Sequence, residues 1–190
     1  MNEPVKLEVV GNSFPRKVQQ RKSDSLTIEE QSRLLDIVDN FQDHALLTLA
    51  LTTGIRREDI VGIEIGGVDL QNRKITFWEH KKRKFHSVPI AAVTVPVLVR
   101  YLNSLPKGQR LLFTFTSRTA YNHLQYFMKR AGINKHIAFH DLRRTFVKTA
   151  KKKGLAPKAI AQILDDKLET VEEWYANLDH DELKEEADKL

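Results

Sequence analysis

The sequence predicts an α+β fold that is mostly helical, with one small antiparallel three-stranded sheet. Apolar residues recur with the helical period along most of the chain, and only residues 68–90 change to short runs typical of strands. The chain has 190 residues, of which 41% are hydrophobic and 29% are charged. This length and composition are typical of a globular domain that buries a hydrophobic core.

The first helices are predicted from their start and stop signals. Thr27 and Glu30 have the spacing of a capping box, which predicts a helix start. The stretch 45–53 is apolar almost all round, so we expect a central, buried helix there. Gly54 is expected to end that helix, and a further short helix is expected over 56–63.

The predicted sheet consists of three short runs, 68–70, 75–78 and 85–90, which are separated by polar residues. The basic run 81–84 falls between the second and third runs, where we expect a hairpin. The helical pattern then returns and predicts five more helices, over 91–104, 117–131, 140–153, 157–164 and 168–177.

Charge is distributed unevenly along the chain. The net charge is +6, but the last twelve residues carry six acids and two lysines, so this segment has −4 and the rest has +10. A body this basic favours an anionic partner, with nucleic acid ahead of membrane. We predict a basic N-terminal arm or linker over 1–23, a folded domain over 24–178, and an acidic C-terminal tail helix over 179–190.

Several classes of protein are excluded or disfavoured by composition. The chain has no cysteine, which excludes disulfides, thiolate metal sites and a cysteine nucleophile. No apolar run approaches the ~20 residues that span a bilayer. Residues 1–10 lack the apolar core of a signal peptide, so we expect a cytoplasmic protein without membrane contact.

Some polar residues stand where local structure does not require them. Arg56 follows a very apolar helix, and His140 and Arg143 share one face of a predicted helix. Tyr175 lies on a late helix, and the run 81–84 is basic. Taken singly, each has an ordinary explanation: a capping arginine, a solvated helix face, a half-buried aromatic residue and a solvated hairpin tip.

Taken together, these segments resemble a known family. They read T-G-I-R-R-E-D-I at 53–60, K-K-R-K-F-H-S-V-P-I at 81–90 and H-D-L-R-R-T-F at 140–146, followed by a tyrosine about thirty residues later. In this order they resemble the catalytic domain of the tyrosine recombinase (phage integrase) family over roughly residues 25–178. The resemblance implies the catalytic-domain fold of that family for residues 24–178.

The resemblance also implies five catalytic residues: a first arginine, a hairpin lysine, a histidine, a second arginine and a nucleophilic tyrosine. In this sequence they are Arg56, Lys81, His140, Arg143 and Tyr175. Lys81 is chosen because the family places its lysine eight residues before the proline of a V-P-[LI] strand, here Pro89. Neighbouring basic residues are expected to contact DNA: Arg57, Lys82, Arg83, Lys84, Arg144 and Lys148.

These residue types suit attack on a phosphodiester. Two guanidinium groups, from Arg56 and Arg143, can bind the non-bridging oxygens and stabilise the charge that builds up in the transition state. Tyr175 can act as a covalent nucleophile with His140 as base or hydrogen-bond donor. Lys81 can protonate the departing 5′ oxygen. No carboxylate cluster suggests two metal ions, so we expect no metal and no cofactor.

One position departs from the family pattern. The family has His or Trp in an L-G-[HW] turn, whereas this chain has Leu164–Lys167 with Asp166 at that position. A carboxylate ~4 Å from a phosphate would be repelled by about 4 kcal/mol at an effective dielectric constant of ~20. Three alternatives follow: Asp166 points away and caps the helix near Leu168, Lys167 or a neighbour replaces it, or the enzyme is degenerate.

The expected function is that of a site-specific DNA recombinase that acts through a 3′-phosphotyrosine intermediate. Family members usually carry an N-terminal core-binding domain, so the chain is expected to be an excised catalytic domain or a remnant. The expected partners are double-stranded DNA and further copies of the chain, assembled on DNA through the tail. Two alternatives remain: a DNA-binding module without cleavage, and a type IB topoisomerase-like enzyme.

Overall fold

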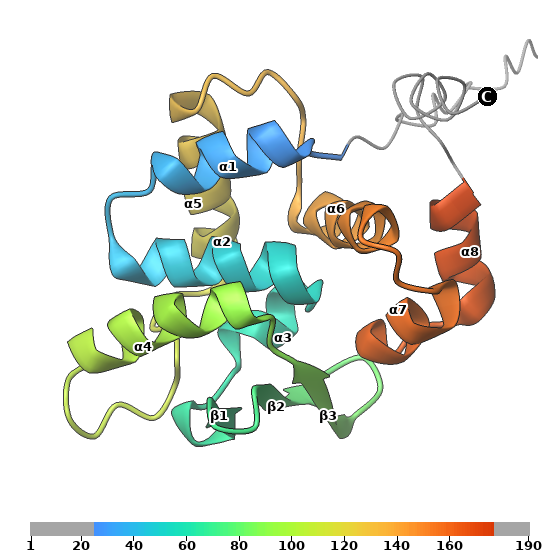
Figure 1. Cartoon of the computed structure of the whole chain (residues 1–190). Helices are drawn as coiled ribbons and strands as arrows, with labels where there is room; N and C mark the ends of the chain where they lie inside the picture. The colour runs from blue at the N-terminus through green and yellow to red at the C-terminus, as the bar shows by residue number, and fades with distance from the viewer. Residues whose placement is uncertain (1–24, 177–190) are drawn as a thin grey trace, which may run out of the picture.

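The computed structural model describes residues 25–176, and the predicted arm and tail lie outside this range. The described residues form eight α-helices, two short 3-10 helices and one sheet (Figure 1). In chain order the elements are α1 (Ile28–Asp36), α2 (Phe41–Thr53), α3 (Arg57–Val61), η1 (Ile65–Gly67), β1 (Val68–Asp69), β2 (Lys74–Glu79), β3 (Lys84–Pro89), η2 (Ala92–Thr94), α4 (Val95–Ser104), α5 (Ser117–Arg130), α6 (Phe139–Lys152), α7 (Pro157–Leu164) and α8 (Leu168–Ala176). The mostly helical α+β class is confirmed.

The predicted capping box at the start of α1 is confirmed. The Thr27 hydroxyl accepts a hydrogen bond from the Glu30 amide at 3.2 Å, and the Thr27 amide donates to Glu30 Oε2 at 2.8 Å. Helix α2 begins four residues earlier than predicted, because the Asn40 side chain accepts a hydrogen bond from the Asp43 amide at 2.8 Å and caps it. Gly54 ends α2 in the left-handed conformation, with φ of 65°.

Helix α2 is the centre of the fold. It is buried on nearly all sides, as the lack of a polar face predicted, and α1, α4, α5 and α6 pack around it (Figure 1). The main hydrophobic core joins this helix to the sheet through Ile75 and Val88, which are paired across β2 and β3.

The sheet is an antiparallel meander in the order β1, β2, β3. Inward and outward residues alternate along β2, with Ile75, Phe77 and Glu79 buried. The basic run lies at the turn between β2 and β3, as predicted, although Lys84 already begins β3. Arg83 in this turn has φ of 53°.

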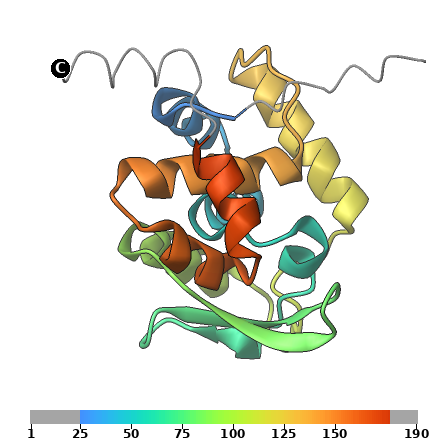
Figure 2. The same ribbon diagram turned by 90° about the vertical axis from the view of Figure 1, so that its right-hand side faces the viewer.

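The last three helices have a smaller core of their own. It joins Phe146 and Val147 of α6 to Ile160 of α7 and Val171 of α8. Figure 2 shows α8 lying across α6 and α7. Within residues 25–176, no helix is both long enough and apolar enough to cross a membrane.

Candidate functional site

The first component of the site is Arg143, which α6 places in the interior. Its side chain is only 5% exposed, so the alternative of a solvated helix face is wrong for this residue. Nη1 donates to the carbonyl of Gly54 at 2.8 Å, and Nη2 donates to the carbonyl of Leu164 at 2.9 Å. Nη2 also lies 2.9 Å from Asp166 Oδ2. Arg143 therefore links α6 to the carboxyl ends of α2 and α7.

Arg56 lies beside Arg143, and the turn after α2 positions it. Gly54 and Ile55 reverse the chain, so that Arg56 becomes the cap residue of α3 with extended backbone. Its guanidinium forms an ion pair with Glu79 at the end of β2, and Nη2 lies 3.5 Å from Asp166 Oδ2. The structure thus brings the two arginines, 87 positions apart in the sequence, to one carboxylate oxygen.

Asp166 points at the two arginines, so the alternative in which it faces away is wrong. Burial would raise the pKa of Asp166, but the hydrogen bond from Arg143 and the charges of Arg143 and Arg56 outweigh it and lower that pKa. The other oxygen, Oδ1, accepts a hydrogen bond from the Lys167 amide at 3.1 Å. Asp166 is therefore ionised at neutral pH and fixed between the guanidinium groups.

His140 lies at the start of α6, one turn before Arg143, and is exposed. Its ring packs edge-on against Trp174 of α8, with ring centroids 5.6 Å apart. Partial desolvation lowers the pKa of His140, and the positive charges of Arg144, Arg143 and Arg56 lower it further. The imidazole is therefore neutral at pH 7 and can accept a proton.

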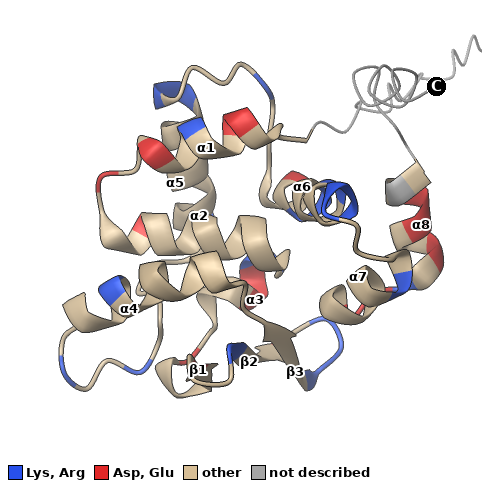
Figure 3. Cartoon of the chain, in the orientation of Figure 1, with Lys and Arg blue, Asp and Glu red and all other residues tan. Residues whose placement is uncertain are grey.

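The hairpin between β2 and β3 reaches the same region. Lys82 Nζ lies 3.1 Å and Lys84 Nζ lies 2.7 Å from Asp165 Oδ2, and Lys82 also donates to the Asp165 carbonyl. In Figure 3 the basic hairpin loop extends toward α7. Lys81 is exposed in this turn, and its ammonium group has no ion-pair partner among the described residues.

Tyr175 lies in α8 directly after Trp174, and its side chain lies outside the described part of the structure. Its neighbour joins α8 to α6, because Trp174 contacts His140 and the Arg144 guanidinium lies 5.6 Å from the centroid of the Trp174 ring. The backbone of Tyr175 is therefore held on the helix that packs beside the arginine site.

The predicted DNA-contacting residues are divided between the hairpin and the helices. Arg83 is exposed beside Lys82 and Lys84 in the hairpin, and Lys148 is half-buried on α6. Arg57 forms an ion pair with Glu58 at 2.8 Å, and Arg144 Nη1 lies 3.9 Å from Asp141 Oδ1.

Sequence reasoning missed the acidic residues that hold the site. Glu79 is 1% exposed and pairs with Arg56. Asp59 is 2% exposed, and its Oδ1 accepts a hydrogen bond from the His80 amide at 2.9 Å, which fixes the start of the hairpin. Glu79 had a signal in the sequence, because it continues the inward alternation of Ile75 and Phe77 and so needed a buried cationic partner.

Asp165 and His86 also hold the site, and no role was predicted for either from the sequence. Asp165 caps α7 in the left-handed conformation, with φ of 45°, and binds the hairpin lysines. His86 Nε2 lies 3.0 Å from the Ile163 carbonyl and joins β3 to α7. Both contacts cross long sequence separations, so only the folded chain reveals them.

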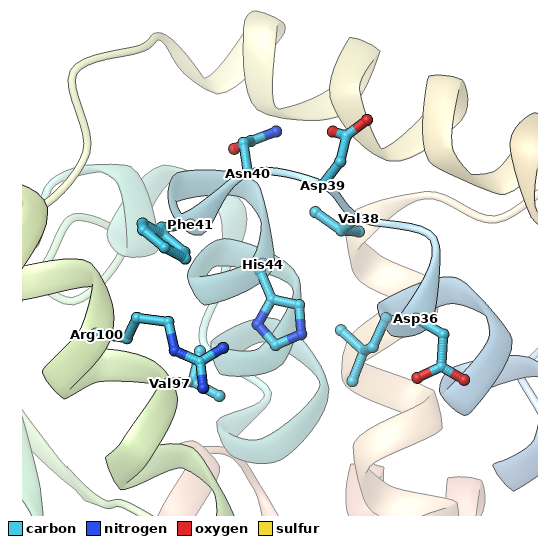
Figure 4. Close-up of a pocket in the computed structure, with 9 residues that line it drawn as sticks. Asp36, Val38, Asp39, Asn40, Phe41, His44, Val97 and Arg100 are labelled. Carbon is cyan, nitrogen blue, oxygen red and sulfur yellow. The ribbon is translucent and has the colours of Figure 1, made fainter.

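Two hollows lie away from the arginine pair. One, of about 210 Å³, lies between the α1–α2 loop and α4, with His44 and Arg100 facing each other across it (Figure 4). A more apolar hollow of about 400 Å³ includes Ile90, Phe146 and Lys153 in its lining. Among the described residues, no group of three or more His, Asp or Glu side chains is arranged to hold a metal ion.

Comparison with known proteins identifies relatives of this chain. Tyrosine recombinase XerA of Saccharolobus solfataricus is 25% identical over 170 residues, which cover 90% of this chain and 57% of that protein. Tyrosine recombinase XerD of Corynebacterium glutamicum is 26% identical over 204 residues, which cover 97% of this chain and 67% of that protein. The chain thus spans little more than half of the length of the XerA relative.

Solved structures agree with these relatives. The crystal structure of XerA recombinase matches with a TM-score of 0.78 and 26% identity, over 87% of this chain and 64% of that one. The XerH recombinase in a post-cleavage complex with its difH substrate matches in fold, with a TM-score of 0.72 and 21% identity, over 87% of this chain and 52% of that one. The phage integrase family model matches residues 24–182. The chain therefore belongs to the phage integrase family, the family of the tyrosine recombinases.

Proposed function

We propose that this chain cleaves and rejoins double-stranded DNA in site-specific recombination, with Tyr175 as the nucleophile. The observation that carries the proposal is the convergence of Arg56 and Arg143 on one anionic oxygen, at 3.5 Å and 2.9 Å. Two guanidinium groups directed at one point are suited to the non-bridging oxygens of a phosphodiester. Family membership and the XerA and XerD relatives support the same reaction class.

The proposed reaction needs no external energy source. The Tyr175 oxygen attacks phosphorus, a 3′-phosphotyrosyl bond forms, and the bond to the 5′ oxygen breaks. Arg56 and Arg143 stabilise the additional negative charge of the transition state. In the reverse direction a 5′ hydroxyl attacks the phosphotyrosine, so the DNA bond is restored and tyrosine is released.

Two further side chains supply proton transfer in this proposal. His140 is neutral at pH 7, since its pKa is lowered by desolvation and by nearby arginines, and so it can take the proton of Tyr175. The ammonium group of Lys81 at the hairpin turn forms no ion pair within residues 25–176, and it can protonate the departing 5′ oxygen. Support comes from Lys82 and Lys84, which bind Asp165, so the hairpin that carries Lys81 is held beside the turn whose Asp166 contacts the arginines.

The surroundings of two of the other three tyrosines, Tyr101 and Tyr126, favour Tyr175 over them as the nucleophile. Burial raises the pKa of Tyr101 to about 12, and its hydroxyl donates to the Leu112 carbonyl at 2.6 Å in the core. The Tyr126 ring lies beside the Arg130 guanidinium on α5, at 5.5 Å, and Arg130 in turn pairs with Asp39. Neither residue is placed beside Arg56 and Arg143.

A suicide DNA substrate, from which the short fragment that bears the new 5′ hydroxyl is lost after cleavage, tests the proposal directly. The parent chain should form a covalent protein–DNA adduct that is visible on a denaturing gel. Tyr175→Phe should form none while binding the duplex as tightly as the parent, because only a hydroxyl is removed. An adduct in Tyr175→Phe would show that another residue is the nucleophile. Strand exchange between two duplexes then separates a recombinase from a topoisomerase-like enzyme.

A second candidate function is that of a DNA-binding module without cleavage. The observation that favours it is Asp166, whose carboxylate lies where a phosphate oxygen would bind. If neither the parent nor Asp166→His forms an adduct while both bind duplex DNA, this second function replaces the first.

We also propose self-association on DNA through residues 179–190. Their sequence combines a charge of −4 with apolar Leu183, Ala187 and Leu190, so it is suited to protein contact and not to phosphate contact. Deletion of 179–190 should reduce the number of protomers bound per DNA site in a mobility-shift titration. Unchanged association would remove the assembly role.

A further inference from the structure

We propose that the turn between α7 and α8, with Asp165 and Asp166, is an internal phosphate mimic that blocks the site until DNA displaces it. The inference rests on the proposed function, because it takes Arg56 and Arg143 as the phosphate-binding pair. It adds an occupant of that site in the free protein and a step that must precede cleavage.

The contacts of Asp166 are those expected of a bound phosphate oxygen. Its Oδ2 lies 2.9 Å from Arg143 Nη2 and 3.5 Å from Arg56 Nη2. The buried carboxylate of Glu79 holds Arg56 from another side. The two arginines and two carboxylates therefore sum to zero formal charge, and the pair has excess positive charge for a phosphate only after Asp166 withdraws.

Asp165 neutralises the lysines of the hairpin as Asp166 neutralises the arginines. Its Oδ2 forms ion pairs with Lys82 Nζ and Lys84 Nζ at 3.1 Å and 2.7 Å, and its carbonyl accepts a hydrogen bond from Lys82. The two adjacent carboxylates of this turn thus bind four cationic side chains. Asp165 binds two lysines of the hairpin, and Asp166 binds the two arginines. All four are proposed to bind the DNA backbone, the two lysines at the hairpin surface and the two arginines as the phosphate-binding pair.

The position of this turn couples its displacement to the nucleophile. The turn follows α7 directly, with Asp165 in the left-handed conformation, and leads into α8, which carries Tyr175. Asp165 and Asp166 are 26% and 21% exposed, so the turn lies at the surface and can move outward without opening the core. When a phosphate replaces Asp166, the turn that leads into α8 loses its contacts with the arginines, and this release couples entry of the substrate to the helix of the nucleophile.

The first test measures the affinity for a short DNA duplex by fluorescence anisotropy in the full 190-residue chain. Asp166→Asn keeps the shape and removes the charge, so it should bind about tenfold more tightly than the parent or better, since a like charge next to the phosphate is lost. Asp39→Asn is the matched control. It removes the same charge from an exposed residue of the α1–α2 loop, Asp39, which pairs with Arg130 of α5.

The comparison with Asp39→Asn decides the result. A gain for Asp166→Asn that clearly exceeds that of Asp39→Asn supports the inference. Equal gains, or weaker binding by folded Asp166→Asn, would overturn it. If Asp166→Asn does not fold, Asp165→Asn takes its place: it leaves the arginine pair intact, releases only Lys82 and Lys84, and should bind duplex several-fold more tightly than Asp39→Asn does.

The second test does not depend on DNA cleavage. Inorganic phosphate is titrated into the parent, Asp166→Asn and Asp39→Asn, and the thermal midpoint is followed. Phosphate should raise the midpoint of Asp166→Asn well above any shift in the other two chains. Equal shifts in all three would overturn the inference. Absence of a covalent adduct in every chain would instead remove the proposed cleavage function, while this phosphate titration still decides whether Asp166 occupies an anion site.

Discussion

At the scale of single residues, the site depends on one buried arginine. Arg143 donates to two main-chain carbonyls and to Asp166, so it serves the structure as well as the proposed chemistry. Lysine cannot replace it, because a single ammonium group does not reproduce the planar fork of donors. The sequence motif indicated that Arg143 binds phosphate. It did not indicate that the same side chain joins α6 to the ends of α2 and α7.

Arg143→Ala should therefore lower stability as well as adduct formation. Two buried carbonyls and one carboxylate lose their donor, and the expected loss of unfolding free energy is about 3 kcal/mol or more. Urea denaturation measures this loss. The control is Arg118→Ala on the exposed face of α5, which should stay within about 0.5 kcal/mol of the parent. A change of that small size for Arg143→Ala would contradict the structural role.

Asp166 predicts how stability depends on pH. The hydrogen bond from Arg143 and the charge of Arg56 lower the folded-state pKa of Asp166 despite its burial. Its contribution to stability is therefore fully present above the unfolded pKa of about 4 and is lost as the pH falls through the lower folded value.

Thermal melts between pH 7 and pH 3 check this dependence. The parent should lose more stability over that range than Asp166→Asn, because the asparagine does not titrate. Asp166→Asn should also be less stable than the parent at pH 7, since the repulsion between Arg56 and Arg143 is no longer compensated. Parallel melting profiles for the two chains would show that the Asp166 contacts do not contribute in solution.

At the scale of elements, the site lies where the ends of several elements meet. The hairpin is held at its start by Asp59 and His80, on β3 by His86 and Ile163, and at its tip by Asp165. The carboxyl end of α2 brings the Gly54 carbonyl to Arg143. Because no single element contains the site, small changes at these ends should alter it.

Gly54→Ala tests the close approach of α2 to the last helices. An added Cβ would lie 2.7 Å from Leu164 and 2.8 Å from Phe146, and φ of 65° is unfavourable for alanine. The expected cost is about 1–2 kcal/mol of backbone strain plus about 1–3 kcal/mol of overpacking.

Gly154→Ala is the matched control for this substitution. Its φ of 80° is also in the left-handed region, but nothing lies within 4 Å of the added Cβ. Urea denaturation of the two variants should give the larger loss for Gly54→Ala, and the difference measures the clash. Equal losses would show that Leu164 and Phe146 move aside without cost.

At the scale of the whole molecule, charge separates the folded body from the C-terminal segment. Apart from residues 179–190, the chain has a net charge of +10, and part of this charge lies on the hairpin and α6 (Figure 3). Affinity for DNA that arises from phosphate contacts is expected to be weakly dependent on sequence and strongly dependent on salt.

The salt dependence can be measured with one duplex between 50 mM and 200 mM salt. If about six cationic side chains contact phosphates, affinity should fall by about a thousandfold over this range. The triple variant Lys82→Ala, Arg83→Ala and Lys84→Ala should show a smaller slope, while the single variant Arg118→Ala serves as the control. Tight binding to one sequence that does not change with salt would contradict a binding mode based on phosphate contacts.

The sequence by itself determined the elements of this protein and the types of its functional residues. Capping signals, apolar periodicity and the change of period at residues 68–90 are local, so the helices and strands could be predicted close to their observed bounds. The motifs singled out Arg56 and Arg143 through their resemblance to those of the tyrosine recombinase family, whereas each arginine taken singly also has an ordinary local explanation. Only the tertiary structure decided how the charges pair. Glu79, Asp165 and Asp166 meet their partners across 23 to 110 positions of sequence, and whether a carboxylate points at an arginine or away from it depends on packing that no local pattern encodes.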